Sequence, residues 1–316
     1  MHSVNDYFSF QIWTKEQIQN RYSQRSGEVR VGDKLMNSSL ENAKYVLIGI
    51  NECCGPLENN GRPGAQNAFS AFTKAFLNTQ IHDGFPGENV LVLGEVMENH
   101  SEHFSGKVSA LDDFLLNILD NYVQAHQIPI FIGGGHNNAL PLIRWAARHK
   151  KTAVVNLDAH ADLRSTENRH SGNSFSTAFE EGSLFHYSVF GLHEAYNNSF
   201  IREALENDQV SHSYFESYLF KKRELLEDLS NVLRHFHSNT HVGLEIDMDA
   251  IAYMPSSALS PSGWSLDQVR QFVHHFRTNQ QQIAYLNLTE AAPNDDGEML
   301  IVGKSLSYLV RDFIGL

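Results

Sequence analysis

Residues 153–162 read AVVNLDAHAD, an apolar run that passes into alternating alanines and titratable residues. The first five have the composition of a buried strand, and Asp158, His160 and Asp162 follow directly. In an extended chain alternate side chains point the same way, so these three groups can converge. Burying them beside an apolar strand is unfavourable unless a cation neutralises their charge. The stretch therefore predicts a metal site at the end of a buried strand.

Other short apolar runs of this kind recur along the chain with helix-like stretches between them. The predicted strands are Tyr45–Ile50, Val90–Leu93, Ile128–Ile132, Ala153–Leu157, His186–Gly191, His241–Ile246 and Ile283–Leu288. Stretches of helix-forming composition include Ala65–Leu77, Leu111–Gln127, Ala139–His149 and Phe200–Leu205. This alternation predicts an α/β fold around a mostly parallel sheet. Residues 51–64 are predicted to form a long irregular loop at the carboxyl edge, where ligands bind.

Two further polar motifs begin where predicted strands end, namely Gly-Gly-Gly-His at 133–136 and Asp247-Met248-Asp249. With residues 158–162 they offer four carboxylates and two imidazoles, a set that suits Mn²⁺ or a similar divalent ion. Six side chains are too few for two separate sites. They suffice for two ions about 3.5 to 4 Å apart if Asp158 and Asp247 bridge, an arrangement that activates a shared water. Taken alone, an Asp-x-Asp pair is more commonly a helix cap or turn.

Composition limits the other classes of function. The chain has 316 residues and a formal charge of −13, which disfavours nucleic-acid and anionic-membrane partners. The basic run 221–223 is followed by acidic residues and is interpreted as a solvated helix face. Neither an apolar run of about 18 to 20 residues nor a signal peptide is recognised, so we expect a cytoplasmic protein. Cys53 and Cys54 are adjacent and are interpreted as loop residues or a small buried pair, not as a structural disulfide.

The three motifs resemble, in order and spacing, those of the ureohydrolase superfamily of arginases, agmatinases and formimidoylglutamases. The resemblance runs from about Tyr45 to Arg311. It implies a single-domain, three-layer arginase-like fold over residues 41–316, with residues 1–40 an N-terminal extension of uncertain role. It also implies two Mn²⁺ ions per subunit, a small-molecule substrate and a homo-oligomer, either a trimer or a hexamer.

By position, the resemblance assigns one ion to His136, Asp158, Asp162 and Asp247, and the other to Asp158, His160, Asp247 and Asp249. Glu290, in the segment Thr289–Pro293, matches a family Glu-x-x-Pro carboxylate that binds the amidine or guanidine group. Two parallel hydrogen bonds from a carboxylate would orient such a planar cation for attack. Judged alone, Glu290 would be interpreted as a surface acid.

Within the superfamily the chain looks most like the formimidoylglutamases, which convert N-formimidoyl-L-glutamate and water to L-glutamate and formamide in histidine degradation. The resemblance depends on Gly135, Arg164, the segment HSGNSF at 170–175 and the segment NNGRPGA at 59–65. Three departures stand against it. Asn137 replaces a frequent Glu, Asn173-Ser174 replaces Thr-Pro, and Ala252 replaces the Asp of arginases.

In this interpretation Arg62 and Arg164, with Asn60, hold the two carboxylates of the substrate, because arginine forks match carboxylates. The alternative is that each arginine makes a structural ion pair. Ser171 falls where arginases place a proton-shuttling His, and His170 lies beside it, so both are candidate catalytic residues.

Two other functions remain open. A guanidino hydrolase of the agmatinase or arginase type would release urea. A catalytically silent binding protein would keep the fold without turnover, although all six ligand positions are filled.

Overall fold

The computed structural model describes residues 7–81, 87–99, 105–236, 238–280 and 282–315. Its described strands form one nine-stranded sheet in the order β1-β3-β2-β4-β9-β8-β5-β6-β7. They are β1 Phe8–Ile12, β2 Tyr45–Asn51, β3 Val90–Glu98, β4 Ile128–Ile132, β5 Lys151–Leu157, β6 His186–Leu192, β7 Val210–Tyr214, β8 Thr240–Asp247 and β9 Ile283–Thr289. β1 pairs antiparallel with β3, and every other pairing is parallel.

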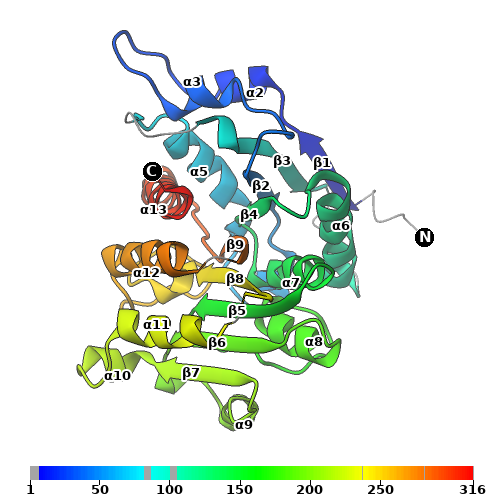
Figure 1. Cartoon of the computed structure of the whole chain (residues 1–316), viewed down its shortest axis with the longest axis vertical. Helices are drawn as coiled ribbons and strands as arrows, with labels where there is room; N and C mark the ends of the chain where they lie inside the picture. Colours follow the sequence, from blue (N-terminus) through cyan, green and yellow to red (C-terminus); the bar gives the residue numbers. More distant parts are fainter. Residues whose placement is uncertain (1–6, 82–86, 100–104, 237, 281, 316) are drawn as a thin grey trace.

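Helices cover both faces of this sheet (Figure 1). The α-helices are α2 Lys15–Gln19, α3 Val31–Leu35, α4 Cys54–Glu58, α5 Ala68–Phe76, α6 Lys107–Tyr122, α7 Ala139–Ala147, α8 Ser174–Glu180, α9 Ser199–Ala204, α10 Phe215–Leu219, α11 Leu225–His235, α12 Leu266–Asn279 and α13 Asp296–Ile314. Short 3₁₀ turns are η1 Ala65–Asn67, η2 Gly87–Asn89, η3 His136–Asn138, η4 Ser171–Asn173, η5 Glu194–Tyr196 and η6 Met248–Ala250. The predicted α/β class with a mostly parallel sheet is confirmed.

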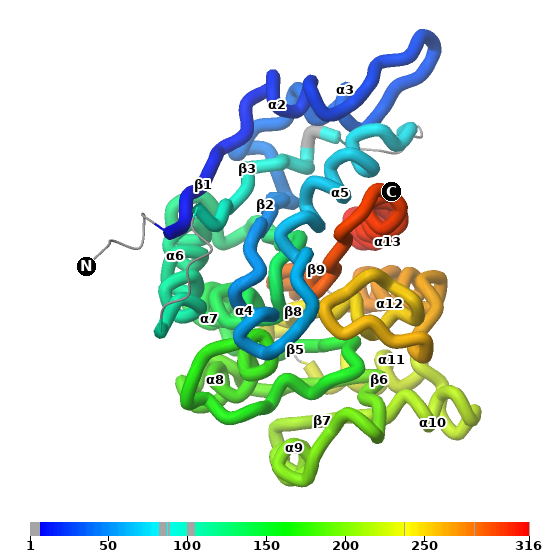
Figure 2. Tube along the Cα trace, turned by 180° about the vertical axis from the view of Figure 1, so that it is seen from behind, coloured from blue at the N-terminus to red at the C-terminus, as the bar shows by residue number. Residues whose placement is uncertain are grey.

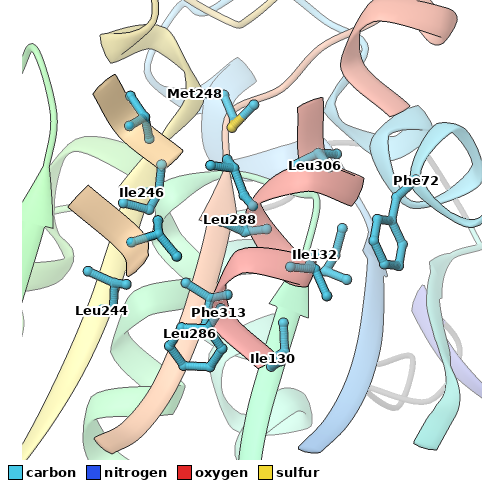
Figure 3. Packing of buried hydrophobic residues seen from close by; sticks show 14 of the residues in the cluster. Phe72, Ile130, Ile132, Leu244, Ile246, Met248, Leu286, Leu288, Leu306 and Phe313 are labelled. Atoms are coloured by element: carbon cyan, nitrogen blue, oxygen red, sulfur yellow. The ribbon is translucent and has the colours of Figure 1, made fainter. Parts of the chain in front are cut away.

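Two hydrophobic clusters, one on each face, hold the three layers together. In the first, Ile130, Leu286 and Leu244 of neighbouring strands pack with Phe313 of α13, as Figure 3 shows. The second lies under α6, α7 and α8 and includes Leu115. Because both faces of the central strands are buried, these strands are continuously apolar, which is typical of parallel sheets.

All seven predicted strands are present, and two edge strands had not been predicted. β1 and β7 lie at opposite ends of the sheet. Only one side chain of the five in each strand is buried, so their sequences lack the apolar run that marked the central strands. β1 also joins residues 8–12 to the sheet, within the segment considered an N-terminal extension.

The predicted loop at 51–64 is partly wrong, because α4 occupies residues 54–58 of it. Pro56 is the third residue of this helix, within its first turn, where a missing backbone N–H removes no helical bond. α4 contacts η3 and η4 at the carboxyl edge of the sheet, and its path out of β2 can be followed in Figure 2. Within the described ranges, no helix has the length and apolar character needed to cross a membrane.

Candidate metal centre and substrate site

The six predicted metal ligands lie together at the carboxyl edge of the sheet. His136 opens η3, three glycines after the end of β4, and residues 158–162 follow β5. Asp247 ends β8, and Asp249 lies in η6 immediately after it. The strand order places β4, β9, β8 and β5 side by side, so loops distant in sequence meet at one edge.

The donor atoms form two groups that share Asp158, each drawn together within 4.8 Å. In the first, His136 Nδ1 lies 3.0 Å from Asp162, 3.1 Å from Asp247 and 3.2 Å from Asp158, measured to a carboxylate oxygen of each. In the second, His160 Nδ1 lies 3.0 Å from Asp249 and 3.8 Å from Asp158. The prediction has both Asp158 and Asp247 bridge the two ions; Asp158 belongs to both donor groups, whereas Asp247 belongs to the first group alone.

Hydrogen bonds from the chain itself orient these carboxylates. Asp158 accepts the backbone N–H of His160 at 2.7 Å on one oxygen and the side-chain amide of Asn156 at 3.0 Å on the other. Asp247 accepts the backbone N–H of Asp249 at 2.8 Å. Each of these two aspartates therefore has a fixed orientation before any ligand binds.

The residues fit a divalent cation. Both ring nitrogens of His136 are buried without a hydrogen bond, although three carboxylates lie within 3.2 Å of Nδ1. Burial and the neighbouring Asp162 raise the pKa of Asp158 to about 6. Burial, then Asp249 and Asp158, raise the pKa of Asp247 well above its usual value. Such crowding of buried acids is relieved when a cation shares their charge.

Aromatic packing holds the two imidazoles. The ring of His136 meets Phe175 edge-on at 5.2 Å between centroids. The ring of His160 stacks on Tyr196 at 5.3 Å, and Tyr196 stacks in turn on His193 at 4.9 Å. Tyr196 is 44% exposed and His193 is buried, so this short column of rings reaches the surface at Tyr196 and is buried again at His193.

Glu290 lies beside the metal centre. Its Oε1 accepts the backbone N–H of His136 at 2.7 Å, and its Oε2 is buried without a hydrogen bond. The residue has a φ of 63°, in the left-handed region that is strained for glutamate. Glu290 is thus not the surface acid that its sequence alone suggested. One oxygen is fixed by the chain and the other is available to a ligand.

Of the predicted substrate residues, Arg62 is held in an ion pair, whereas Arg164 and Asn60 are exposed. Arg62 is held by Glu298 of α13 at 2.5 Å, which is the structural ion pair considered as the alternative for this residue. Arg164 is exposed and donates to Oδ1 of Asn59 at 2.8 Å. Asn60 is exposed and has a φ of 59°. The two arginines are therefore in different chemical environments.

Ser171 and His170 lie in the turn that opens η4. Asn59 donates from its amide to the Ser171 hydroxyl at 3.2 Å. His170 Nδ1 accepts the backbone N–H of Gly172 at 3.0 Å, so its remaining proton is on Nε2. Burial lowers the pKa of His170, which favours the neutral ring. His170 can therefore donate a hydrogen bond through Nε2–H, whereas protonation would break its bond to Gly172.

Two buried acids near the centre, Glu52 and Glu245, are not among the predicted site residues. Glu52, directly after β2, accepts the backbone N–H of Gly135 at 2.7 Å and the amide of Asn138 at 3.0 Å. Glu245, within β8, lies 3.4 Å from His136 Nε2. Glu52 had a recognisable signal, because it is a carboxylate at the end of a predicted strand. Glu245 had a weaker signal, because it alternates with Asp247 and Asp249, but this alternation does not show that it faces His136.

Two of the three departures from the formimidoylglutamase pattern, Asn137 and Asn173-Ser174, make hydrogen bonds within the site. Asn173 donates to the carbonyls of Ser165 and Asn168 at 2.8 and 2.7 Å, and Ser174 donates to the carbonyl of His136 at 2.7 Å. The amide of Asn137 donates to its neighbour Asn138 at 3.0 Å. These side chains hold the loops of the site in place.

A family model described as the arginase family matches residues 43–311. A formimidoylglutamase of Salmonella paratyphi C is 32% identical over 280 residues, which is 84% of each chain. Another, from Cupriavidus pinatubonensis, is 27% identical over 217 residues, covering 65% of this chain and 66% of that one. A crystal structure of Trypanosoma cruzi formiminoglutamase with Mn²⁺ covers 91% of this chain and 99% of its own, with a TM-score of 0.73 and 18% identity. From the span of the family match and the 32% identity, this chain belongs to the arginase family.

Proposed function

We propose that this chain is a binuclear manganese hydrolase that cleaves the C–N bond of N-formimidoyl-L-glutamate, giving L-glutamate and formamide. The observation that carries the proposal is the pair of buried donor groups sharing Asp158 at the carboxyl edge of the sheet. The choice of substrate is supported by formimidoylglutamases that are up to 32% identical over 84% of the chain.

The first ion would be held by His136, Asp158, Asp162 and Asp247, and the second by Asp158, His160, Asp247 and Asp249. When bound, two such ions supply Lewis acidity and a water acidic enough to act as a nucleophile near neutral pH. Mn²⁺ suits the mixed oxygen and nitrogen donors. It is also the ion in the Trypanosoma cruzi formiminoglutamase structure.

The chain itself would bind and orient the substrate. Glu290, with Oε1 fixed by the His136 N–H, would accept an amidine N–H on its unpartnered Oε2. This contact holds the planar carbon in one orientation for attack. Exposed Arg164, with Asn60 beside its partner Asn59, would hold a glutamate carboxylate. His170 would donate from Nε2–H to the substrate nitrogen, and Ser171 would support the same turn.

The cellular location and the oligomeric state of the enzyme are also part of the proposal. We propose a cytoplasmic enzyme of histidine degradation that assembles as a homo-oligomer of three or six subunits, as the family resemblance implies. Light scattering coupled to size-exclusion chromatography would measure the mass of the assembly. A monomer at micromolar concentration would contradict this part of the proposal alone.

The decisive experiment measures which product leaves. Mn²⁺-loaded protein is incubated with N-formimidoyl-L-glutamate, arginine or agmatine, and formamide and urea are quantified in parallel. The proposal expects formamide from the first compound and little urea from the others. Rapid urea release would establish a guanidino hydrolase. Full metal occupancy without turnover of any of the three compounds would favour the silent binding protein.

A further inference from the structure

A polar cavity of about 700 Å³ lies at the amino edge of the sheet, opposite the metal centre. Tyr45, Ile128, Ile283 and His241 line it, from the first positions of β2, β4 and β9 and the second of β8. These four parallel strands are neighbours in the sheet, so their amino ends necessarily share this edge. His241 and Asp247 lie about 20 Å apart along β8 at the usual rise of an extended strand.

The lining of this cavity is basic. It contains three fixed cations, Lys44, Lys150 and Arg277, and three imidazoles, His126, His149 and His241. Among the described residues that line it, none is acidic. The chain carries a net charge of −13, so a local excess of positive charge needs a specific explanation.

The cations of the cavity have no carboxylate partner within the described part of the chain. Lys150 donates from Nζ to the neutral amide oxygen of Gln282 at 2.8 Å. The Lys44 ammonium lies 5.1 Å from the ring centroid of Tyr45. Arg277 has a buried Nε without a hydrogen bond, whereas Arg270, two helical turns away on α12, is paired with Asp312 at 2.7 Å. Lys44 and Lys150 are exposed, so the cost of an unsatisfied buried donor falls on Arg277, and a bound anion would remove it.

His241 gives an independent indication that the cavity is positively charged. Its Nδ1 is buried without a hydrogen bond among the described residues. Burial lowers its pKa, and the positive charges of Lys150 and His149 lower it further. The imidazole therefore faces cations and contains an unpartnered polar atom at the cavity wall.

We propose that this basic cavity binds a small anion that carries a phosphate group. A phosphate monoester has close to two negative charges at neutral pH and three acceptor oxygens, so it can be shared by cations that approach from different strands. A single carboxylate has half that charge. The site is separate from the metal centre, and the proposal does not depend on the substrate of the enzyme.

Binding is tested on the metal-loaded full chain by isothermal titration calorimetry with inorganic phosphate and with AMP, at constant ionic strength. Acetate provides a singly charged comparison. The variant Lys150→Gln/Arg277→Gln removes two cations of the cavity. Its matched control, Arg25→Gln/Lys222→Gln, removes the same charge from exposed residues that do not line it.

We expect saturable binding of at least one phosphate probe, weaker binding of acetate, and an affinity reduced by roughly tenfold to a hundredfold or more in the cavity variant. The control variant should bind as the parent does.

Tighter binding of AMP than of phosphate would identify a nucleotide-type ligand. Equal binding of the two probes would identify a site for the phosphate group alone. The proposal is overturned if neither probe saturates the parent, if acetate binds equally well, or if both double variants lose affinity alike. Parental thermal stability of the cavity variant would show that lost binding is not lost folding.

Discussion

The Nε2 atom of His136 lies 3.4 Å from a carboxylate oxygen of Glu245, and both side chains are completely buried. The other ring nitrogen of His136 faces Asp158, Asp162 and Asp247. Histidines that bind metals commonly direct their second N–H to a carboxylate, which sets the tautomer and orients the ring. We therefore expect Glu245, supplied by the strand that ends in Asp247, to act as a positioning residue for His136.

Replacing Glu245 should weaken metal binding without removing a ligand. Glu245→Leu eliminates the acceptor and should lower Mn²⁺ affinity by about tenfold to a hundredfold, the range seen when such outer contacts are lost. Glu245→Gln retains an acceptor oxygen and should recover most of that affinity. Competitive titration with a metal-binding dye measures both. Equal affinities for the Leu variant and the parent would show that Glu245 does not position His136.

Loss of the shared ligand should remove activity and metal-dependent stability together. Asp158→Ala deprives both donor groups of a common carboxylate, so activity should fall below a few per cent. Adding Mn²⁺ should raise the melting temperature of the parent, because a ligand of the folded state stabilises it. That increase should be absent in Asp158→Ala.

Asp249→Ala affects one donor group only, so excess Mn²⁺ should partly restore its activity. Substantial activity in Asp158→Ala would contradict a two-metal site.

The two arginines should behave differently. Arg164→Lys keeps the charge but loses the fork, so kcat/KM should fall roughly tenfold to a hundredfold, mainly through KM. Arg62→Lys is the matched control, because Arg62 is already paired with Glu298. It should change kcat/KM little. Metal content, measured by atomic emission, should be unchanged in both. If only Arg62→Lys raises KM, the substrate carboxylate lies at Arg62 instead.

Breaking the buried ion pair between Arg169 and Asp112 should lower the free energy of unfolding. Arg169 holds Asp112 at 2.9 Å, and their side chains are 8% and 1% exposed. Burial raises the pKa of Asp112 to about 6 despite the opposing effect of Arg169, so forming the pair yields little net stability. Breaking it leaves a buried cation, however, and Asp112→Asn should lower the free energy of unfolding by about 3 to 5 kcal/mol.

Urea unfolding of the metal-loaded protein measures this difference. The comparison is Asp120→Asn, which breaks the exposed pair with Arg148 and should lower the free energy of unfolding by about 0 to 1 kcal/mol. Equal effects of the two substitutions would show that burial of the Asp112 pair is unimportant.

The adjacent thiols should react slowly. Burial and the neighbouring Glu52 raise the pKa of Cys53 to about 11 and that of Cys54 well above its usual value. Thiolate is the reactive form, so at pH 8 Ellman's reagent should modify Cys53 roughly a hundredfold more slowly than an ordinary cysteine. Unfolding in guanidinium should restore the normal rate for both residues. Fast labelling of the folded chain would contradict the burial of this pair.

The fold class and the candidate ligands could be predicted from the amino-acid sequence, because both follow from local patterns. Central strands are apolar wherever both faces are buried, so all seven could be predicted from short windows. Polar residues that directly follow such strands must lie at the same edge of a parallel sheet. This rule was enough to bring Asp158, Asp247 and His136 together before their distances were known.

The groups that surround these ligands could not be predicted, because they come from segments that are far apart in the sequence. Arg62 and Glu298 are 236 positions apart, and no local pattern distinguishes an arginine bound to a distant helix from one facing a substrate. The edge strands β1 and β7 have few buried side chains, so their pairing depends on the neighbouring strand more than on their own sequence. Glu245 looks like an acid within an apolar strand until the packing of β8 places it against His136. These contacts depend on how separate segments pack, because alternation along a strand shows which side a residue faces but not what lies there.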